Sequence, residues 1–372
     1  MLFSPVPKSS REDFFDREAE LESLQRFLKS DAPLCLILGL RRSGKSSLLR
    51  VGLKEAGMPS ITLDLRVLEE KLRPSYADLL DLMSGELSSF ASRRRGLAKA
   101  ILEAFKSVEG IEVEGLRISF RWSGRGAVRL VDLLAGLERA FRASGTVGVV
   151  AFDEAQELAA VPGLRFDSVL AYAYDNFSNL KVVLTGSKVG LLYRFLRFDD
   201  PKAPLFGRAV WRIELPYFSK EQSLEFLKRG FEQVQLKVSE KELVEVVEAL
   251  DGVPGWLSYY GFLRVQGLSH EAALSEAKAR GVQLLLGELE SFLRLRPLAR
   301  DRYAAILYAL ATGARRWSEI KRVAEARLAE RIPPKNFTEL LNHLLEVGFL
   351  VKENDGYTLP DPLIREASLR LQ

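Results

Sequence analysis

The sequence contains very few of the residues that usually build disulfides and metal clusters. Its 372 residues include one cysteine, Cys35, and two histidines, His270 and His343. A single cysteine excludes an intrachain disulfide, and because Cys35 lies inside an apolar run, a place in the core suits it better than a role as a nucleophile. The two histidines are far apart in the chain, which is not the spacing of a zinc site.

Long hydrophobic runs and a large net charge are also missing. The longest apolar runs, Leu34 to Leu38 and Val147 to Phe152, are far shorter than the ~18 to 20 residues that cross a bilayer. The amino-terminal segment MLFSPVPKSSRED has no apolar run of signal-peptide length. We therefore expect a cytoplasmic protein with no membrane partner. The net charge of +4 does not by itself call for a nucleic-acid partner.

What the sequence does contain is a complete phosphate-binding loop. The apolar run Leu34 to Leu38, of strand length, leads into GLRRSGKS at residues 39–46, which fits the Walker A pattern G-x-x-x-x-G-K-[ST]. Gly39 and Gly44 permit backbone angles that let successive N–H groups curl around an anion. We expect the nucleotide to contact the loop and the helix that follows it, through Gly39, Arg41, Arg42, Ser43, Gly44, Lys45, Ser46 and Ser47.

The helix after the loop is predicted from Lys45 to about Lys54. Its amino terminus favours negative charge, since the helix dipole and the first N–H groups point toward the loop. Lys45 would reach the β- and γ-phosphates. Ser46 would place its hydroxyl on a Mg²⁺ ion bound between them.

A Walker B pattern follows well after the P-loop. The apolar run Val147 to Phe152 predicts a strand buried on both faces, and it ends in Asp153 and Glu154. Asp153 would hold the Mg²⁺, whereas Glu154 would polarise the water that attacks the γ-phosphate. With the P-loop, this pair predicts an ATPase that takes ATP with Mg²⁺ and releases ADP.

Two further positions are candidates for the same site. The predicted strand from Lys181 to Leu184 ends at a hydroxyl residue, Thr185, or failing it Ser187, which would face the crevice at the carboxyl ends of the strands. This hydroxyl would bind the γ-phosphate or the attacking water, or else serve only to form a turn. Arg208 precedes the last predicted strand, Val210 to Leu215. It would stabilise transition-state charge in its own or a neighbouring subunit, or else form a surface ion pair.

The region from 67 to about 126 is too long for a simple crossover between strands, and we interpret it as an insertion in a nucleotide-binding domain at 1–217. It predicts helices from Tyr76 to Ser92 and on to about Lys106, then a hairpin formed by Ile111 to Val113 and Leu116 to Trp122. Its basic residues would form either a solvated face or a patch for an acidic partner; these are Arg93, Arg94, Arg95, Lys99, Arg117, Arg121 and Arg125.

The sequence from Ser219 onward is wholly helical in pattern until a terminal hairpin. Capping boxes at Ser219 and Ser239 open two helices of a lid predicted at 218–298, and Gly252-Val253-Pro254 breaks and restarts the helical pattern. Residues 299–372 predict three helices and a hairpin around Asn354-Asp355-Gly356, a winged helix. Its recognition helix, Lys335 to Val347, has few cations for phosphate contacts, which favours a protein partner over DNA.

The order of these motifs resembles the archaeal ATPase family in the AAA+ and STAND group of P-loop proteins. The resemblance rests on GLRRSGKS, Asp64-Leu65-Arg66, FDEAQ, LTGSKVGLL, PLFGR, the GxP turn and the winged helix. It implies an α/β fold with sheet order 5-1-4-3-2, a helical lid and a winged helix, and it assigns nucleotide roles to Lys45, Ser46, Asp153, Glu154 and the sensor hydroxyl Thr185. The FxxRE-like segment, with Phe15 and Arg17, would lie near the adenine, and the GxP turn would bring Pro254 toward the nucleotide.

One departure from mainstream AAA+ proteins affects the functional prediction. Residues 252–257 contain no arginine of the sensor-2 kind, which fits a STAND-like switch better than a processive ring motor. Our first hypothesis is therefore a slowly hydrolysing ATP switch. The alternatives are a non-hydrolysing, ATP-gated binding module and a DNA-binding AAA+ initiator or regulator; oligomerisation stays open in each case.

Overall fold

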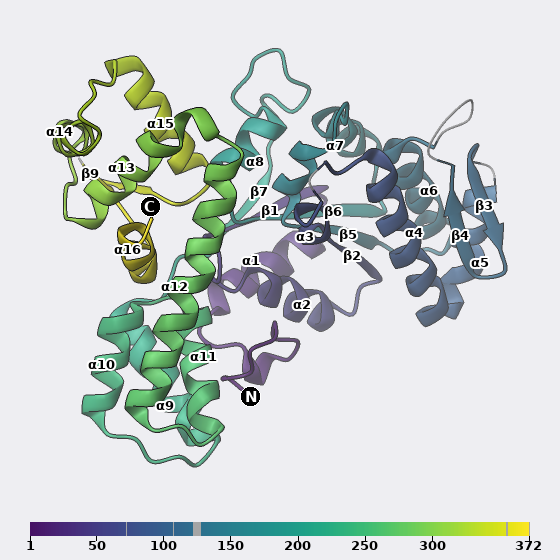
Figure 1. Ribbon diagram of the computed structural model, residues 1–372. Helices are drawn as coiled ribbons and strands as arrows, with labels where there is room; N and C mark the ends of the chain where they lie inside the picture. Colours follow the sequence, from purple (N-terminus) through teal and green to yellow (C-terminus); the bar gives the residue numbers. More distant parts are fainter. Residues whose placement is uncertain (72, 107, 122–127, 355, 372) are drawn as a thin grey trace. The chain divides into compact units, whose positions relative to one another are not determined.

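The computed structural model describes residues 1–71, 73–106, 108–121, 128–354 and 356–371. The chain divides into two compact units (Figure 1). The sheet unit comprises Arg17–Gly39 and Lys45–Leu215, and the helical unit comprises Met1–Asp16, Leu40–Gly44 and Pro216–Gln372. The P-loop is thus shared, since its middle residues group with the helical unit.

A five-stranded parallel sheet forms the centre of the sheet unit. Its strands stand in the order β2-β5-β6-β1-β7 and all neighbouring pairs are parallel. Numbered along the chain, this order reads 5-1-4-3-2 from the β7 edge. The strands are β1 (Leu34–Leu38), β2 (Ser60–Asp64), β5 (Gly148–Asp153), β6 (Leu180–Gly186) and β7 (Trp211–Glu214).

Burial along these strands follows their place in the sheet. Every residue of β1, β5 and β6 is buried, as expected for parallel strands that lie inside a sheet with both faces covered. The edge strand β2 alternates between buried and half-buried residues. The P-loop strand and the Walker B strand therefore lie in the buried centre of the unit.

Helices connect and cover the strands. Helix α1 has Leu21, Leu24, Phe27 and Leu28 on its buried face, which is the spacing of an amphipathic helix. Helix α2 begins at Lys45, directly after the P-loop. The remaining helices near the sheet are α3 (Arg66–Glu69), α6 (Leu130–Ala143), the 3₁₀ helix η2 (Ala155–Ala160), α7 (Phe166–Asn176) and α8 (Val189–Leu196), while α1 spans Glu18–Lys29 and α2 spans Lys45–Ala56.

The predicted insertion contains the expected two helices and hairpin. These are α4 (Tyr76–Arg93), α5 (Arg95–Lys106) and the antiparallel strands β3 (Ile111–Glu114) and β4 (Arg117–Phe120). Ser75 caps α4 by accepting a hydrogen bond from the backbone of Asp78. Trp122 and Arg125, which the sequence placed in the hairpin and in the basic patch, lie outside the described residues. The backbone but not the side chain of Arg95 is described, and the other predicted patch residues, Arg93, Arg94, Lys99, Arg117 and Arg121, are exposed.

Two helices of the helical unit open with predicted capping boxes, and the structure confirms both. Ser219 opens α9 (Lys220–Gln233) and Ser239 opens α10 (Glu240–Leu250). Pro254 is the first residue of α11 (Pro254–Val265), where its fixed φ suits the start of a helix. A long helix, α12 (His270–Arg294), follows.

The amino-terminal segment packs into these helices, which the sequence did not predict. Phe3 is fully buried and lies against Gly230 of α9 and Gly261 of α11, where a Cβ atom at either glycine would come within 2.3 Å of its ring. Leu2 donates its backbone N–H to Gln233 at 2.7 Å. This segment also contains the 3₁₀ helix η1 (Arg11–Asp13). Residues 1–16 therefore belong to the helical unit, whereas the finer boundaries 217/218 and 298/299 stay predictions.

The carboxyl-terminal residues form the predicted three helices and two-stranded hairpin. The helices are α13 (Arg300–Ala311), α14 (Trp317–Leu328) and α15 (Pro334–Glu346), preceded by the 3₁₀ helix η3 (Pro297–Ala299), and the antiparallel strands are β8 (Val351–Glu353) and β9 (Gly356–Thr358). Asp355, in the predicted turn, lies outside the described residues. A final helix, α16 (Pro362–Leu369), was not predicted.

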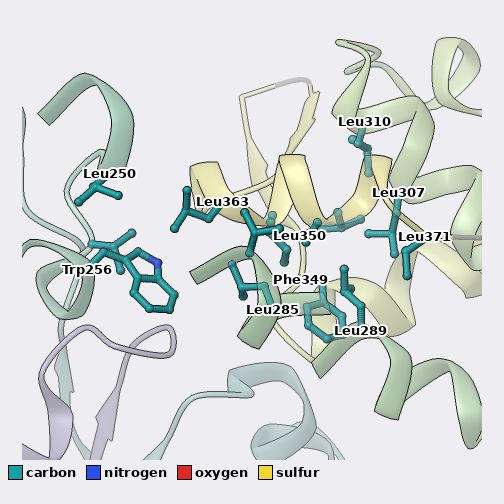
Figure 2. Packing of buried hydrophobic residues seen from close by; sticks show 14 of the residues in the cluster. Leu250, Trp256, Leu285, Leu289, Leu307, Leu310, Phe349, Leu350, Leu363 and Leu371 are labelled. Atoms are coloured by element: carbon teal, nitrogen blue, oxygen red, sulfur yellow. The ribbon is translucent and has the colours of Figure 1, made fainter. Parts of the chain in front are cut away.

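One hydrophobic core runs through this part of the helical unit (Figure 2). Leu285 and Leu289 of α12, Leu307 of α13 and Leu363 of α16 all contribute to it.

No helix in the described part of the chain is both long and apolar enough to cross a membrane.

Candidate nucleotide-binding and hydrolysis site

The Walker A and Walker B residues meet at the carboxyl edge of the sheet. Ser46 lies in the first turn of α2, and its Oγ donates a hydrogen bond to Oδ2 of Asp153 at 2.7 Å. Lys45 and Asp153 are almost fully buried. The structure thus brings together the P-loop hydroxyl and the strand-end carboxylate that the sequence assigned to one metal ion.

Thr185 fixes the other side of the same carboxylate. It is fully buried near the end of β6, and its Oγ1 donates to Oδ1 of Asp153. The same oxygen accepts the backbone N–H of Glu154 at 2.9 Å. The predicted sensor residue therefore touches both acidic residues.

Glu154 is held at both of its carboxylate oxygens. Its backbone has φ +58°, a left-handed conformation that turns the chain sharply after β5. Oε1 lies 3.6 Å from Nζ of Lys45. Oε2 accepts hydrogen bonds from the Ser187 backbone at 3.1 Å, from the Ser187 hydroxyl, and from Nε2 of Gln156 at 2.7 Å. The carboxylate stays partly accessible, at 14% exposure, and is oriented toward the P-loop lysine.

The oxygen atoms at this point suit a magnesium ion. Mg²⁺ prefers hard oxygen ligands and is usually held by one or two protein groups together with phosphates and water. Ser46 and Asp153 offer one hydroxyl and one carboxylate in direct contact. Among the described residues no group of three or more His, Cys, Asp or Glu side chains could hold a metal alone. One hydroxyl and one carboxylate are the kind of protein ligands that a nucleotide-bound Mg²⁺ would need here.

A charged pair at the end of β2 lies beside the Walker B residues. Asp64 is the register partner of Asp153 in the sheet. Arg66 binds the Asp64 carboxylate through Nε at 2.8 Å, and this hydrogen bond lowers the pKa of Asp64. The same bond raises the pKa of Arg66, with Asp153 and Glu154 adding to the effect. A fixed positive charge thus offsets the acidic cluster.

Gln156 is a site residue to which sequence reasoning gave no role. It is 1% exposed and donates to Glu154 and, at 3.0 Å, to Glu157. Its Oε1 is buried without a hydrogen-bond partner. Lys188 bridges Glu157 and Glu69 at 2.8 and 3.1 Å. The FDEAQ motif contained Gln156, but its contact with Glu154 depends on the left-handed backbone at Glu154, which the pattern does not reveal.

The middle of the P-loop makes its contacts inside the helical unit. Arg41 and Arg42 both pair with Glu288 of α12 at 2.8 Å. Ser43 is buried, and its Oγ has no hydrogen-bond partner, as expected for a hydroxyl whose partner is a ligand oxygen. Gly44 has φ +104°, which a side chain would rarely adopt.

The other predicted residues lie in different surroundings. Phe15 packs against Phe218 and Phe226, with ring centroids 5.6 Å apart in each pair. Arg17 is buried and pairs with Glu20 at 3.1 Å. Burial raises the pKa of the Cys35 thiol, which agrees with a core residue. The remaining predicted residues are Ser47, buried in α2, and Gly39, whose N–H bonds to Gly186 at 3.3 Å.

Arg208 does not join the acidic cluster. Its guanidinium pairs with Asp175 of α7 at 2.7 Å and lies over the ring of Tyr174. Asp175 is half exposed, so this contact is a surface ion pair within the sheet unit.

The comparisons with known proteins agree with this geometry. Residues 14–260 match the model of an ATPase domain found predominantly in Archaea. Residues 297–359 match the winged helix-turn-helix domain at the carboxyl terminus of MCM proteins. Among curated proteins none matches this chain.

Solved structures that cover nearly the whole chain include the following two. The Walker-type ATPase of Pyrococcus abyssi is 35% identical, with a TM-score of 0.84 over 99% of this chain and 100% of that one. The ORC2 protein of Aeropyrum pernix, in ADPNP and ADP complexes, is 16% identical with a TM-score of 0.59 over 100% and 96% of the two chains. The second likeness shows the fold alone. Because the family model spans most of the chain and the P-loop, Walker B and sensor residues meet at one edge of the sheet, the protein belongs to the ATPase family found predominantly in Archaea and carries a winged-helix domain at its carboxyl terminus.

Proposed function

We propose that this protein is a Mg²⁺-dependent ATPase that acts as a nucleotide-driven molecular switch. The observation that carries the proposal is the contact set in which Ser46 and Thr185 both bind Asp153 while Lys45 faces Glu154. Lys45 would contact the β- and γ-phosphates, and Ser46 and Asp153 would hold the Mg²⁺ that offsets their charge.

Glu154 is the proposed general base. Water attacks the γ-phosphorus, the bond from that phosphorus to the bridging oxygen breaks, and the water proton passes to the Glu154 carboxylate, leaving ADP and phosphate. Ser187 and Gln156 occupy Oε2 with hydrogen bonds, while Oε1 faces the lysine. A carboxylate held by these hydrogen bonds favours slow ATP turnover. Turnover would rise when a rearrangement or a partner frees the Glu154 carboxylate to accept the water proton.

The remaining predicted residues are assigned to other parts of the nucleotide. We propose that the backbone of Gly39 to Gly44 surrounds the phosphates, with the unpartnered Ser43 hydroxyl as a further donor. Phe15 and Arg17 are proposed to lie at the adenine, and Pro254 at the turn by which the helical unit senses the nucleotide, as in STAND switches.

ATP turnover by three proteins tests the enzymatic claim. Wild type should hydrolyse ATP, Lys45→Ala should lose both binding and turnover, and Glu154→Gln should bind ATP but turn it over at least a hundredfold more slowly. Equal rates in all three proteins would remove the claim. The non-hydrolysing, ATP-gated binding module is the function that would then remain.

DNA binding through the winged helix is a second candidate. It is favoured by the match to the MCM winged helix and by exposed Arg315, Arg316 and Arg322 before and within α14. The predicted recognition helix, α15, supports DNA binding less. Its His343 binds the Tyr303 hydroxyl, and its exposed face offers one lysine, Lys335, for phosphate contacts. Duplex binding that weakens steeply with salt would support this function, and no binding at low salt would end it, leaving a protein partner at the winged helix or the insertion.

A further inference from the structure

Arg42 occupies an unfavourable backbone conformation in the middle of the P-loop. Its φ is +65°, in the left-handed region where a side chain meets the backbone and where glycine is the usual residue. A P-loop binds phosphates mainly through backbone N–H groups, so the shape of residues 40–44 decides what the loop can hold. Some other part of the molecule must therefore stabilise Arg42 in this conformation.

The contacts that hold Arg42 come from α11 and α12. Its guanidinium pairs with Glu288 at 2.8 Å and lies 4.3 Å from the ring centre of Trp256. Its carbonyl accepts the backbone N–H of Gly255 at 3.2 Å. A Cβ atom at Gly255 would come within 2.8 Å of the Arg42 Cβ, so glycine is needed for this approach. The Arg42 side chain and backbone are both fixed by the helical unit.

The neighbouring residue is tied to the same helices. Arg41 pairs with the second oxygen of Glu288 at 2.8 Å, and its carbonyl accepts the Tyr217 hydroxyl at 2.9 Å. One carboxylate therefore serves two consecutive P-loop arginines. Both guanidinium groups are directed at Glu288 of α12, which favours a structural use of the two side chains.

Trp256 is itself fixed by the winged-helix region. Its indole N–H donates to Oδ2 of Asp361 at 2.8 Å, and Oδ1 of Asp361 accepts the N–H of Leu363 at 2.9 Å at the start of α16. Figure 2 shows Trp256 and Leu363 within the same hydrophobic cluster. The carboxyl-terminal helix thus supports the ring on which Arg42 lies.

We propose that Glu288 and Trp256 are positioning residues for the P-loop. They hold Arg42 in the left-handed conformation that shapes residues 40–44 for phosphate, and through Asp361 they make nucleotide affinity depend on the packing of α16. This role rests on the proposed function, because it assumes that the loop binds a nucleotide.

ADP binding measured by titration calorimetry tests this role without any hydrolysis. Glu288→Ala should weaken ADP binding roughly 5- to 30-fold, the range expected when a left-handed side chain loses its support. In an Arg42→Gly background the same substitution should weaken binding less than about threefold, since glycine adopts positive φ without support. Glu290→Ala is the matched control on α12, because Glu290 pairs with Arg300, and it should bind ADP as wild type does.

The outcomes separate the alternatives. Tighter ADP binding by Glu288→Ala would mean that Glu288 competes with phosphate for the arginines, and this result would overturn the positioning role. An equal loss of ADP affinity on Glu288→Ala in the wild-type and Arg42→Gly backgrounds would overturn it as well. So would unchanged ADP affinity in a Glu288→Ala protein whose thermal unfolding matches that of wild type. A wild-type protein that binds neither ADP nor ATP would instead count against the proposed function itself.

Discussion

At the scale of single residues, Thr185 links the two acidic residues of Walker B. One hydroxyl donates to Asp153 and accepts from the backbone of Glu154, in a fully buried position. A hydrogen bond to a charged group in such a place contributes about 1.5–3 kcal/mol. The geometry of both carboxylates therefore depends on this side chain.

Thr185→Val should keep the shape of β6 but leave Oδ1 of Asp153 without its donor, while Ser46 still binds Oδ2. We expect kcat for ATP hydrolysis to fall about tenfold or more, since ~1.4 kcal/mol corresponds to a factor of ten, with ATP affinity changed much less. Steady-state kinetics over a range of ATP concentrations gives both values. Thr62→Val on the edge strand β2 is the control; equal kcat in wild type and Thr185→Val would contradict the assignment.

The sequence predicted the residues of this cluster better than their contacts. Spacing and apolar context were enough to identify Lys45, Ser46, Asp153 and Glu154 as neighbours, because carboxyl ends of parallel strands share one edge. The choice of Thr185 rested on the family resemblance. The sequence could not show that Ser187 and Gln156 both bind Glu154. Those contacts accompany a positive φ at Glu154, which is uncommon for a glutamate and is not marked by the motif.

At the scale of elements, α10 depends on an ionised capping residue. Hydrogen bonding to the Ser239 backbone, together with Arg264, lowers the pKa of Glu242 from 4.5 to about 2. A depressed pKa means that the ionised group stabilises the fold above its unfolded pKa of 4.5. This contribution is lost as the pH falls from 4.5 toward 2.

Glu242→Gln should therefore flatten the pH dependence of stability in that window. Glutamine still accepts a hydrogen bond from Ser239 but cannot titrate. Urea unfolding at pH 5, 4 and 3 should show wild type losing more free energy of unfolding than the variant. Glu240→Gln, in the same first turn, is the control. Parallel curves for wild type and Glu242→Gln would refute the prediction.

Elements with a strong repeating pattern were predicted well, and short ones were not. Helices α2 and α4, predicted from Lys45 to about Lys54 and from Tyr76 to Ser92, have limits within two residues of those observed. The eight-residue helices α8 and α16 were not predicted, since two turns give too little periodicity to recognise. The burial of Phe3 between two glycines is a long-range packing event with no local signal.

At the scale of the whole molecule, Arg208 tests whether one subunit is sufficient for ATP hydrolysis. Because it pairs with Asp175 at the surface, we expect any catalytic role to need a second subunit. In that case turnover per subunit should rise with protein concentration, and a mixture of Arg208→Ala and Lys45→Ala should recover activity that neither has alone. Near-normal turnover by Arg208→Ala alone would remove this residue from the site.

The residues of the P-loop fall into both compact units of the chain. Lys45 and Ser46 group with the sheet, whereas Leu40–Gly44 group with the helical unit. The proposed switch is driven by the nucleotide that these residues would bind. This account requires that bound ATP be converted to ADP.

A single-turnover experiment tests that requirement most directly. Wild type, Lys45→Ala and Glu154→Gln would each be mixed with substoichiometric γ-labelled ATP and Mg²⁺, and bound nucleotide would be followed over hours. The account predicts that wild type releases labelled phosphate and retains ADP, that Glu154→Gln retains intact ATP, and that Lys45→Ala binds neither. Intact ATP on the wild-type protein after hours with Mg²⁺ would contradict it.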